Sequence, residues 1–405
     1  MSTTPRGPAI IEALLSKGVR LPHPASVEVA DDIDPDRISG DGVTIHAGCR
    51  LRGAGTVISA GCTLGVEGPV TIENCQLGPA VDLKGGYFAK SVFLDGANLG
   101  LAAHVREGTI LEEEAGGAHC VGLKQTILFP FVTLGSLINF CDCLMSGGTS
   151  RSDHSEVGSS YIHFNFTPDG NKTTASLFGD VARGVMLDQP AIFLGGQGGA
   201  VGPVATGFGT VVAAGSVLRG DVLDDGMLVI PDAPRSQTRP VAKHSYRQLT
   251  RILERNLTYV ANLDALEAWY RGVRRPFFAA QELGGFVYEG ALAALAGARG
   301  ERVKRLKTLI GHLDDADGAR HELRAQADAV LAVFRTPDAP DTDAPAPLAS
   351  ELADALGAGR GYVAAIKGLT PDARAAGVAW LQGLVDRRTA QASAPVPSLN
   401  LFPTP

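Results

Sequence analysis

The sequence predicts a mainly β protein, a left-handed parallel β-helix of hexapeptide repeats over residues 38–235, followed by an α-helical C-terminal domain. Between Ile38 and Val222 the chain keeps returning to an aliphatic residue, then glycine or a small polar residue, then two variable positions and a small residue. From about Ala242, apolar residues recur instead at steps of three and four. Since 50 of the 405 residues are glycine and 24 are proline, long helices alone do not account for the composition.

The repeats explain the β-helix physically. Their clearest run is VGPVATGFGTVVAAGSV at residues 201–217. A strand of about four to six residues buries no face alone, but copies stacked about 4.8 Å apart pair their backbone groups and build a continuous aliphatic column. Glycine or asparagine supplies the positive φ angles at the corners. The alternative is an antiparallel sandwich, which needs longer strands and more two-residue hairpin turns than this sequence offers.

The remaining elements follow from changes in composition. An amphipathic helix is expected from Leu249 to Tyr270, where charged residues separate the apolar positions. The expected order is an N-terminal segment 1–37, the β-helix 38–235, a helical domain 243–335, a Pro- and Asp-rich linker 336–349, a helical segment 350–390 and a disordered tail 391–405.

Composition excludes several classes of function. A net charge of −7 gives no basic surface for nucleic acid or for an anionic membrane. The chain has no apolar run of about 18 residues and no secretory signal at its start, so a cytoplasmic protein is expected. The six cysteines form no CxxC pair, and we expect buried thiols without a metal site.

Residues 146–172 carry the groups suited to chemistry. Strand alternation after Ser160 sorts six side chains into an inward set, Ile162, Phe164 and Phe166, and an outward set, Tyr161, His163 and Asn165. A turn at 167–170 then brings Asn171 and Lys172 beside the outward row. We therefore expect a polar binding surface here, with Tyr161, Asn171 and Lys172 in contact with the substrate.

A resemblance to a known family becomes specific at this point. The segment NFTPDGNK at 165–172, followed by LFGD at 177–180, resembles the Asn-Tyr-Asp-Gly-x-Asn-Lys and Ile-Gly-Asp motifs of bacterial glucosamine-1-phosphate N-acetyltransferases. That activity forms one half of the bifunctional enzyme that makes UDP-N-acetylglucosamine. The similarity covers about residues 120–235, and its last part resembles the coils that hold acetyl-CoA. Nothing before residue 120 resembles the family's nucleotide loop, so the uridylyltransferase activity is not expected.

The resemblance implies roles for individual residues. Asn165, Phe166 and Lys172 match positions that bind the amino sugar and its phosphate, and Ala214 matches a backbone contact to the pantetheine arm of acetyl-CoA. Asp153-His154 resembles the Asn-His pair that carries the catalytic histidine.

Three positions depart from the family. Val157 stands in place of a tyrosine, Leu144 in place of a phosphate-binding lysine, and the arginine that contacts the cofactor in the family has no counterpart at the matching position around Asp232. These changes bear on the substrate and on whether the site is catalytic.

The residues themselves suit acyl transfer from a thioester. The reaction needs a base, which His154 or His163 would supply, with Asp153 or Glu156 orienting the ring. It also needs a donor to the oxyanion, which Asn165 or a backbone N–H would provide. The alternative is that both histidines cap turns or pack at a subunit interface.

Two further features are candidates for binding. Arg151 either pairs with Asp153 or binds a phosphate. The glycine cluster at 193–199, with Gly196 and Gly198, either lets a cofactor approach the backbone or forms a loop that protrudes from one coil; it lacks the setting of a dinucleotide site or a P-loop.

Three classes of function remain open. The favoured one is a CoA-dependent acyltransferase that uses acetyl-CoA and acts on a sugar phosphate or a nucleotide sugar, without nucleic-acid or membrane partners. The second is a non-catalytic β-helix that binds a sugar nucleotide or serves as a scaffold. The third is a zinc enzyme of the β-helix carbonic anhydrase kind, which needs three converging imidazoles. Because one chain cannot cover the flat faces of a prism, we expect a homotrimer with sites between subunits.

Overall fold

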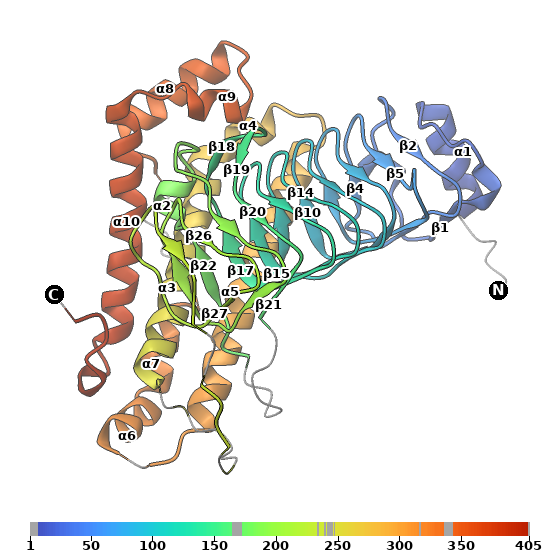
Figure 1. Cartoon of the computed structure of the whole chain (residues 1–405). Helices are drawn as coiled ribbons and strands as arrows, with labels where there is room; N and C mark the ends of the chain where they lie inside the picture. Colours follow the sequence, from blue (N-terminus) through green and yellow to red (C-terminus); the bar gives the residue numbers. More distant parts are fainter. Residues whose placement is uncertain are drawn as a thin grey trace.

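The computed structural model confirms a parallel β-helix followed by a helical region (Figure 1). It describes residues 7–163, 172–232, 235–238, 240, 246, 248–315, 317–335 and 343–403. Each coil contributes short strands to three faces, and within each face successive coils pair in parallel. Asn165, Phe166 and Asn171 lie outside the described residues.

The strands of the solenoid divide among its three faces. The first face contains β1 (Glu28–Val29), β3 (Arg50–Arg52), β6 (Val70–Glu73), β9 (Gly86–Ala89), β12 (Ala103–Val105), β15 (Val121–Leu128), β17 (Ile138–Met145), β21 (Ser160–Ile162), β24 (Gly198–Ala200) and β27 (Val217–Leu218). The second face contains β4 (Val57–Ile58), β7 (Gln76–Leu77), β10 (Ser91–Phe93), β13 (Thr109–Leu111), the C-terminal halves of β15 and β17, β22 (Ser176–Phe178) and β25 (Ala205–Thr206). The third face contains β2 (Thr44–Ile45), β5 (Thr63–Leu64), β8 (Asp82–Leu83), β11 (Asn98–Leu99), β14 (Gly116–Gly117), β16 (Thr133–Leu134), β20 (Glu156–Val157), β23 (Phe193–Leu194), β26 (Val211–Val212) and β28 (Leu228–Val229).

Columns of aliphatic side chains form the core. On the third face, Ile45, Leu64, Leu83 and Leu99 are successive partners along the stack, and all four are fully buried. Burial of one such side chain stabilises the fold by about 1.5–3 kcal/mol. The repeated column therefore supplies the hydrophobic core that the sequence pattern predicts.

The corner between the first and second faces differs from the prediction in residue type. Asn74, Lys90, Gln125 and Asp142 all have positive φ angles, between 50° and 56°. Lysine, glutamine and aspartate thus occupy positions where glycine or asparagine was expected. Each of the four residues lies between a strand segment of the first face and a strand segment of the second face.

Two insertions interrupt the coils near their C-terminal end. The antiparallel pair β18 (Gly148–Ser150) and β19 (Asp153–His154) lies between the second and third faces. One coil later, α2 (Val181–Gly184) lies at the same corner.

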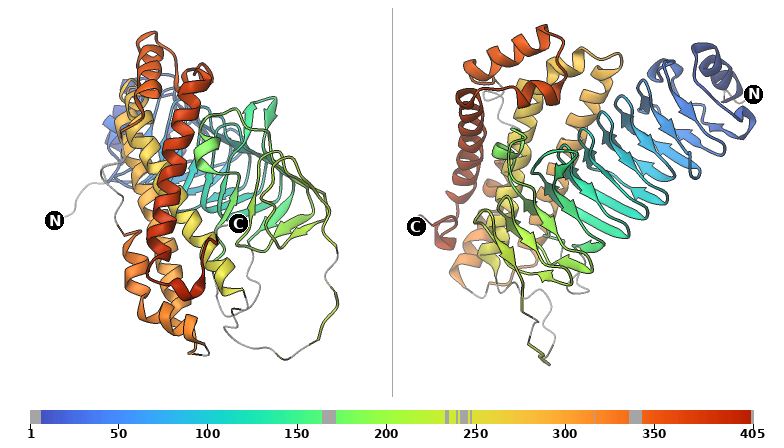
Figure 2. Two further views of the ribbon diagram at one scale, coloured as in Figure 1. Left: turned by 90° about the vertical axis from the view of Figure 1, so that its left-hand side faces the viewer. Right: turned by 45° about the horizontal axis from the view of Figure 1, so that its top comes forward.

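The helices pack along the second face (Figure 2). They are α3 (Leu249–Trp269), the π-helical turn η3 (Tyr270–Arg274), α4 (Arg275–Ala279), α5 (Gly284–Gly311), α6 (Gly318–Ala325), α7 (Ala327–Ala332), α8 (Ala346–Gly357), α9 (Tyr362–Lys367), α10 (Pro371–Ser393) and the 3-10 turn η5 (Pro397–Leu399). Helix α5 lies over β7, β10 and β13, while α3 contacts β22 and α10 packs on α3. None of the described helices is both long and apolar enough to cross a membrane.

A buried ionic cluster joins the helices to the solenoid. Arg274 is 2% exposed and contacts the carboxylates of Glu112 and Glu113 on the coil after β13. The hydroxyl of Tyr270 donates a hydrogen bond of 2.7 Å to Glu112. Burial is the main effect that raises the pKa of Glu113 to about 8, with the neighbouring Glu112 adding to it and Arg274 opposing it.

Three predicted boundaries need correction. The solenoid begins before residue 38, since Arg20 already bridges to Thr44 and β1 lies within the segment 1–37. That part is capped by α1 (Gly7–Lys17), η1 (Pro24–Ser26) and η2 (Pro35–Arg37). Helix α8 starts inside the predicted linker 336–349. The tail 391–405 is packed rather than disordered through residue 403, because Val396, Leu399 and Leu401 are buried against the helices.

Candidate functional site

The predicted site residues lie at three different corners of the prism. Arg151 and His154 belong to the hairpin between the second and third faces. His163 and Lys172 lie between the first and second faces. Gly196, Gly198 and Ala214 lie where the third face leads into the first. A single chain therefore does not bring together His154, Lys172 and Ala214, the residues predicted to act as base, to bind the sugar phosphate and to contact the cofactor.

His154 is held by the backbone of its own hairpin. Its Nδ1 atom lies 2.9 Å from the carbonyl oxygen of Arg151. Because a carbonyl only accepts, Nδ1 carries the proton of the neutral ring and Nε2 keeps its lone pair. His154 is half-buried, and within the described residues Nε2 has no hydrogen-bond partner.

Other hairpin contacts differ from the predicted ones. Asp153 accepts a hydrogen bond of 2.7 Å from Thr149 Oγ1, and the His154 ring is oriented by a carbonyl rather than by a carboxylate. Arg151 does not pair with Asp153. Its Nη1 donates instead to Glu114 O, Phe131 O and Thr133 Oγ1, at 2.9–3.0 Å.

These contacts hold the hairpin rigidly. The Arg151 bonds tie it to two neighbouring coils, and Lys367 of α9 donates to Thr149 O at 2.9 Å. A Cβ added to Gly148, whose φ is +91°, would lie 2.5 Å from the Cα of His154. Only glycine therefore allows the two strands of the hairpin to approach this closely. The double glycine before the Ser-Arg-Ser-Asp-His segment is the sequence signal of this turn.

His163 does not point outward as predicted. It is 8% exposed, and its positive φ of 60° ends the strand alternation that Tyr161 and Ile162 still follow. Nδ1 donates to Cys141 O at 2.6 Å, and Nε2 accepts from Ser176 Oγ at 2.8 Å.

The burial of His163 lowers its pKa to about 4, so the ring is neutral at physiological pH. Both ring nitrogens already have partners inside the protein, and a Cβ on Gly202 would lie 2.5 Å from Nε2. His163 therefore connects neighbouring coils, and His154 is the better placed candidate base.

Tyr161 and Lys172 remain accessible. Tyr161 is 61% exposed on the first face, as predicted. Lys172 is exposed, and its carbonyl accepts a hydrogen bond of 3.4 Å from Arg302 Nη1 of α5. That contact places Lys172 beside the helical region.

The glycine cluster at 193–199 serves the stacking of coils. A Cβ on Gly195 would lie 2.4 Å from the backbone nitrogen of Ala214, and one on Gly158 would lie 2.5 Å from that of Gly196. The cluster is part of the column, so the alternative of a protruding loop is wrong. Ala214 itself is exposed at this corner.

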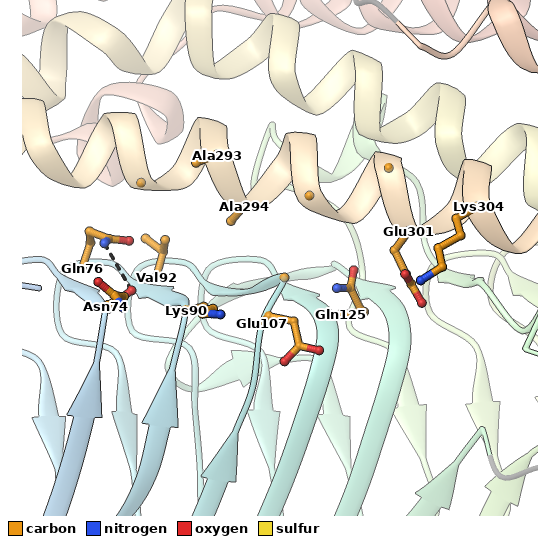
Figure 3. Close-up of a pocket in the computed structure, with 14 residues that line it drawn as sticks. Asn74, Gln76, Lys90, Val92, Glu107, Gln125, Ala293, Ala294, Glu301 and Lys304 are labelled. Atoms are coloured by element: carbon orange, nitrogen blue, oxygen red, sulfur yellow. Dashed lines mark hydrogen bonds between the residues drawn. The ribbon is translucent and has the colours of Figure 1, made fainter. Parts of the chain in front are cut away.

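A groove under α5 was not predicted from the sequence. It has a volume of about 450 Å³ and lies between α5 and the corner of the first and second faces (Figure 3). Its solenoid wall includes Asn74, Lys90 and Gln125, three of the residues with positive φ at that corner. These residues are far from α5 in the sequence, so no local pattern indicates the groove.

The chain matches no protein-family model, and a search of curated proteins finds no related sequence. Within the described residues, no group of three His, Cys, Asp or Glu side chains is arranged to hold a metal ion.

Proposed function

We propose that this protein is a CoA-dependent acyltransferase that transfers an acyl group, acetyl in the simplest case, to a sugar phosphate or nucleotide sugar. The parallel β-helix is compatible with hexapeptide-repeat acyltransferases. The observation that carries the proposal is the hydrogen bond from His154 Nδ1 to Arg151 O, which leaves Nε2 as an oriented base on a rigid hairpin.

The chemistry follows from that geometry. Nε2 of His154 removes a proton from the amine or hydroxyl of the acceptor as this group attacks the thioester carbonyl. The C–S bond then breaks, the acyl group stays on the acceptor, and the thiolate of CoA takes the proton from the imidazolium. Asn165 or a backbone N–H is the proposed donor to the oxyanion.

A homotrimer would unite the separate corners. The third face lies between the His154 corner and the Ala214 corner, and its last strands expose Phe193, Val211 and Leu228 in a row. Packing of this apolar row against a neighbouring subunit would bring the hairpin of one chain toward the Ala214 corner of the next. Sedimentation that shows a stable monomer would contradict this arrangement.

The test is acyl transfer from radiolabelled acetyl-CoA to glucosamine 1-phosphate and to UDP-glucosamine. We expect His154→Ala to lower kcat by about 10²–10⁴-fold, as removal of a general base does. His23→Ala, which changes an exposed histidine at the other end of the solenoid, is the matched control. A His154→Ala variant as active as the wild type would refute the role of this residue. Absence of any turnover or acetyl-CoA binding would refute the acyltransferase itself.

A second candidate, non-catalytic binding of a sugar nucleotide, is favoured by one observation. Leu144 and Val157, which replace the lysine and tyrosine of the resembling family, are both 0% exposed in the core. Neither position reaches a ligand at the surface. Binding of UDP-N-acetylglucosamine without any affinity for acetyl-CoA would support this function over the first.

A further inference from the structure

The groove under α5 exists because the residues of α5 that face the solenoid there are small. Small residues form its helical wall, namely Gly290, Ala293, Ala294, Gly297 and Gly300. At Gly290 an added Cβ would lie 2.4 Å from Gln76 Oε1, so glycine is needed for the helix to rest on the solenoid. At Gly297 and Gly300 an added Cβ would meet nothing within 4 Å.

Close contacts therefore do not explain why residues 297 and 300 are glycine. Glycine inside a helix is less favourable than alanine, because it loses more backbone freedom on folding. Since no neighbouring atom requires glycine at 297 or 300, the residues leave free volume beside the solenoid at the expense of helix stability.

The solenoid wall presents a buried polar atom without a partner. Gln125 is 7% exposed and lines the groove, and its Oε1 accepts no hydrogen bond. A Cβ on Gly108 would lie 2.5 Å from the amide, so this glycine makes room for the side chain. An unpaired buried acceptor destabilises the folded state, and a ligand with an O–H or N–H group would supply the missing hydrogen bond.

Two carboxylates and two ammonium groups line the groove, and both carboxylates are already paired with cations outside it. Glu107 pairs with Lys124 at 2.8 Å, and Glu301 pairs with Arg305 at 2.5 Å. Lys90 and Lys304 also line the groove, and neither has an ion pair within the described part of the chain. Figure 3 shows Glu301 and Lys304 together at one end of the groove and Lys90 along its solenoid wall.

We infer that this groove binds a sugar phosphate, with the anion attracted by the ammonium groups of Lys90 and Lys304 along the groove and a hydroxyl donating to Gln125 Oε1. The volume of about 450 Å³ admits a ligand of this size. The groove lies at a different corner from His154, so this site is separate from the proposed transfer site and does not depend on it.

Titration calorimetry on the full-length protein tests the inference, with glucose 1-phosphate, inorganic phosphate and glucose as probes. We expect glucose 1-phosphate to bind most tightly, because only it offers both the phosphate and the hydroxyls. Lys90→Ala and Lys304→Ala should each weaken its binding about tenfold, as loss of a charge-assisted hydrogen bond does. Lys307→Ala, an exposed lysine of α5 outside the groove, should leave binding unchanged.

A variant that fills the groove distinguishes a loss of binding from a loss of folding. Gly297→Leu should raise the melting temperature, because leucine is a better helix former, while it abolishes binding by filling the groove. Gly383→Leu, at an equally open position in α10, should stabilise the protein without affecting binding. The inference is overturned if no probe binds saturably below about 10 mM. It is also overturned if binding occurs but survives Gly297→Leu and both lysine variants.

Discussion

The guanidinium carbon of Arg274 lies 3.9 Å from the ring centroid of Tyr362, so the π-helical turn after α3 stacks directly on α9. The same guanidinium contacts Glu112 and Glu113 of the solenoid. One buried cation therefore connects three parts of the chain that are far apart in sequence. Since two carboxylates share it, the protonation of this cluster affects how firmly the helices are attached.

The contribution of Glu113 to the stability of the fold should fall as the pH rises from about 4.5 to about 8. Burial raises the pKa of Glu113 from 4.5 to about 8, so in this window the folded protein keeps a proton that the unfolded chain has released. By linkage, this contribution is complete below pH 4.5 and is lost as the pH rises through 8. Chemical denaturation at several pH values measures the effect. Glu113→Gln, which stays neutral, should show a smaller decline over the same range, and an identical decline would contradict the assignment.

Replacement of Arg274 should be among the most damaging single changes. Arg274→Ala leaves the buried carboxyl groups of Glu112 and Glu113 without their cation, for which we expect a loss of about 3–5 kcal/mol in the free energy of unfolding. Arg275→Ala, at the next and exposed position, should cost less than about 0.5 kcal/mol. Urea melts of the two variants compare them directly, and equal midpoints would show that the cluster does not stabilise the fold.

His163 should make the stability of the fold depend on pH in the opposite direction, with a loss of stability on acidification. Because burial lowers the pKa of His163 to about 4, the folded state binds fewer protons than the unfolded state between pH 6.5 and pH 4. Stability from this residue is complete above pH 6.5 and is lost as the pH falls toward 4, by about 3 kcal/mol at most.

His163→Asn is a suitable comparison, because asparagine tolerates the positive φ at this position. The difference in stability between wild type and variant should shrink on acidification. In NMR spectra, the His163 ring should not titrate above pH 5, whereas a transition near 6.5 would show that the ring is accessible.

Gly148 should matter for activity more than for the fold. Gly148→Ala forces a Cβ to within 2.5 Å of the Cα of His154, so the hairpin must open and shift the ring. We expect at least a tenfold loss of acyl transfer with little change in the melting temperature, since the hairpin lies outside the stacked coils. Gly220→Ala, where an added Cβ meets nothing within 4 Å, is the control. Equal activity of both variants would argue against a role for the hairpin in positioning His154.

Much of the fold was predictable because its signal is local and repeated. The aliphatic positions that form the column of Ile45, Leu64 and Leu83 recur in nearly every coil, and each copy supports the same conclusion. The helical pattern from Leu249 onward is equally local. The outer boundaries were less accurate, since burial of Leu399 depends on contacts with distant helices.

The candidate site was harder to predict because the directions of its side chains depend on the backbone conformation at the corners of the solenoid. A positive φ at His163 turns the ring inward, and no residue type there signals such a turn. Lys90 and Gln125 adopt the same backbone region without being glycine or asparagine. The groove needs, in addition, the placement of α5 over the second face. The double glycine before His154 was visible in the sequence, but its closeness to the histidine backbone was not.

Helix α5 also limits how this protein can change in length. Gly290 rests on Gln76 of β7, and Arg302 pairs with Asp142 of β17. Twelve helical residues span about 18 Å, and the four steps of the stack from β7 to β17 span about 19 Å. The length of α5 between these two contacts thus matches the height of the coils that it spans. Repeat proteins commonly grow by duplication of a unit, but an extra coil inserted between these two strands would displace one end of α5 by nearly 5 Å, so any such duplication would require a matching insertion in the helix.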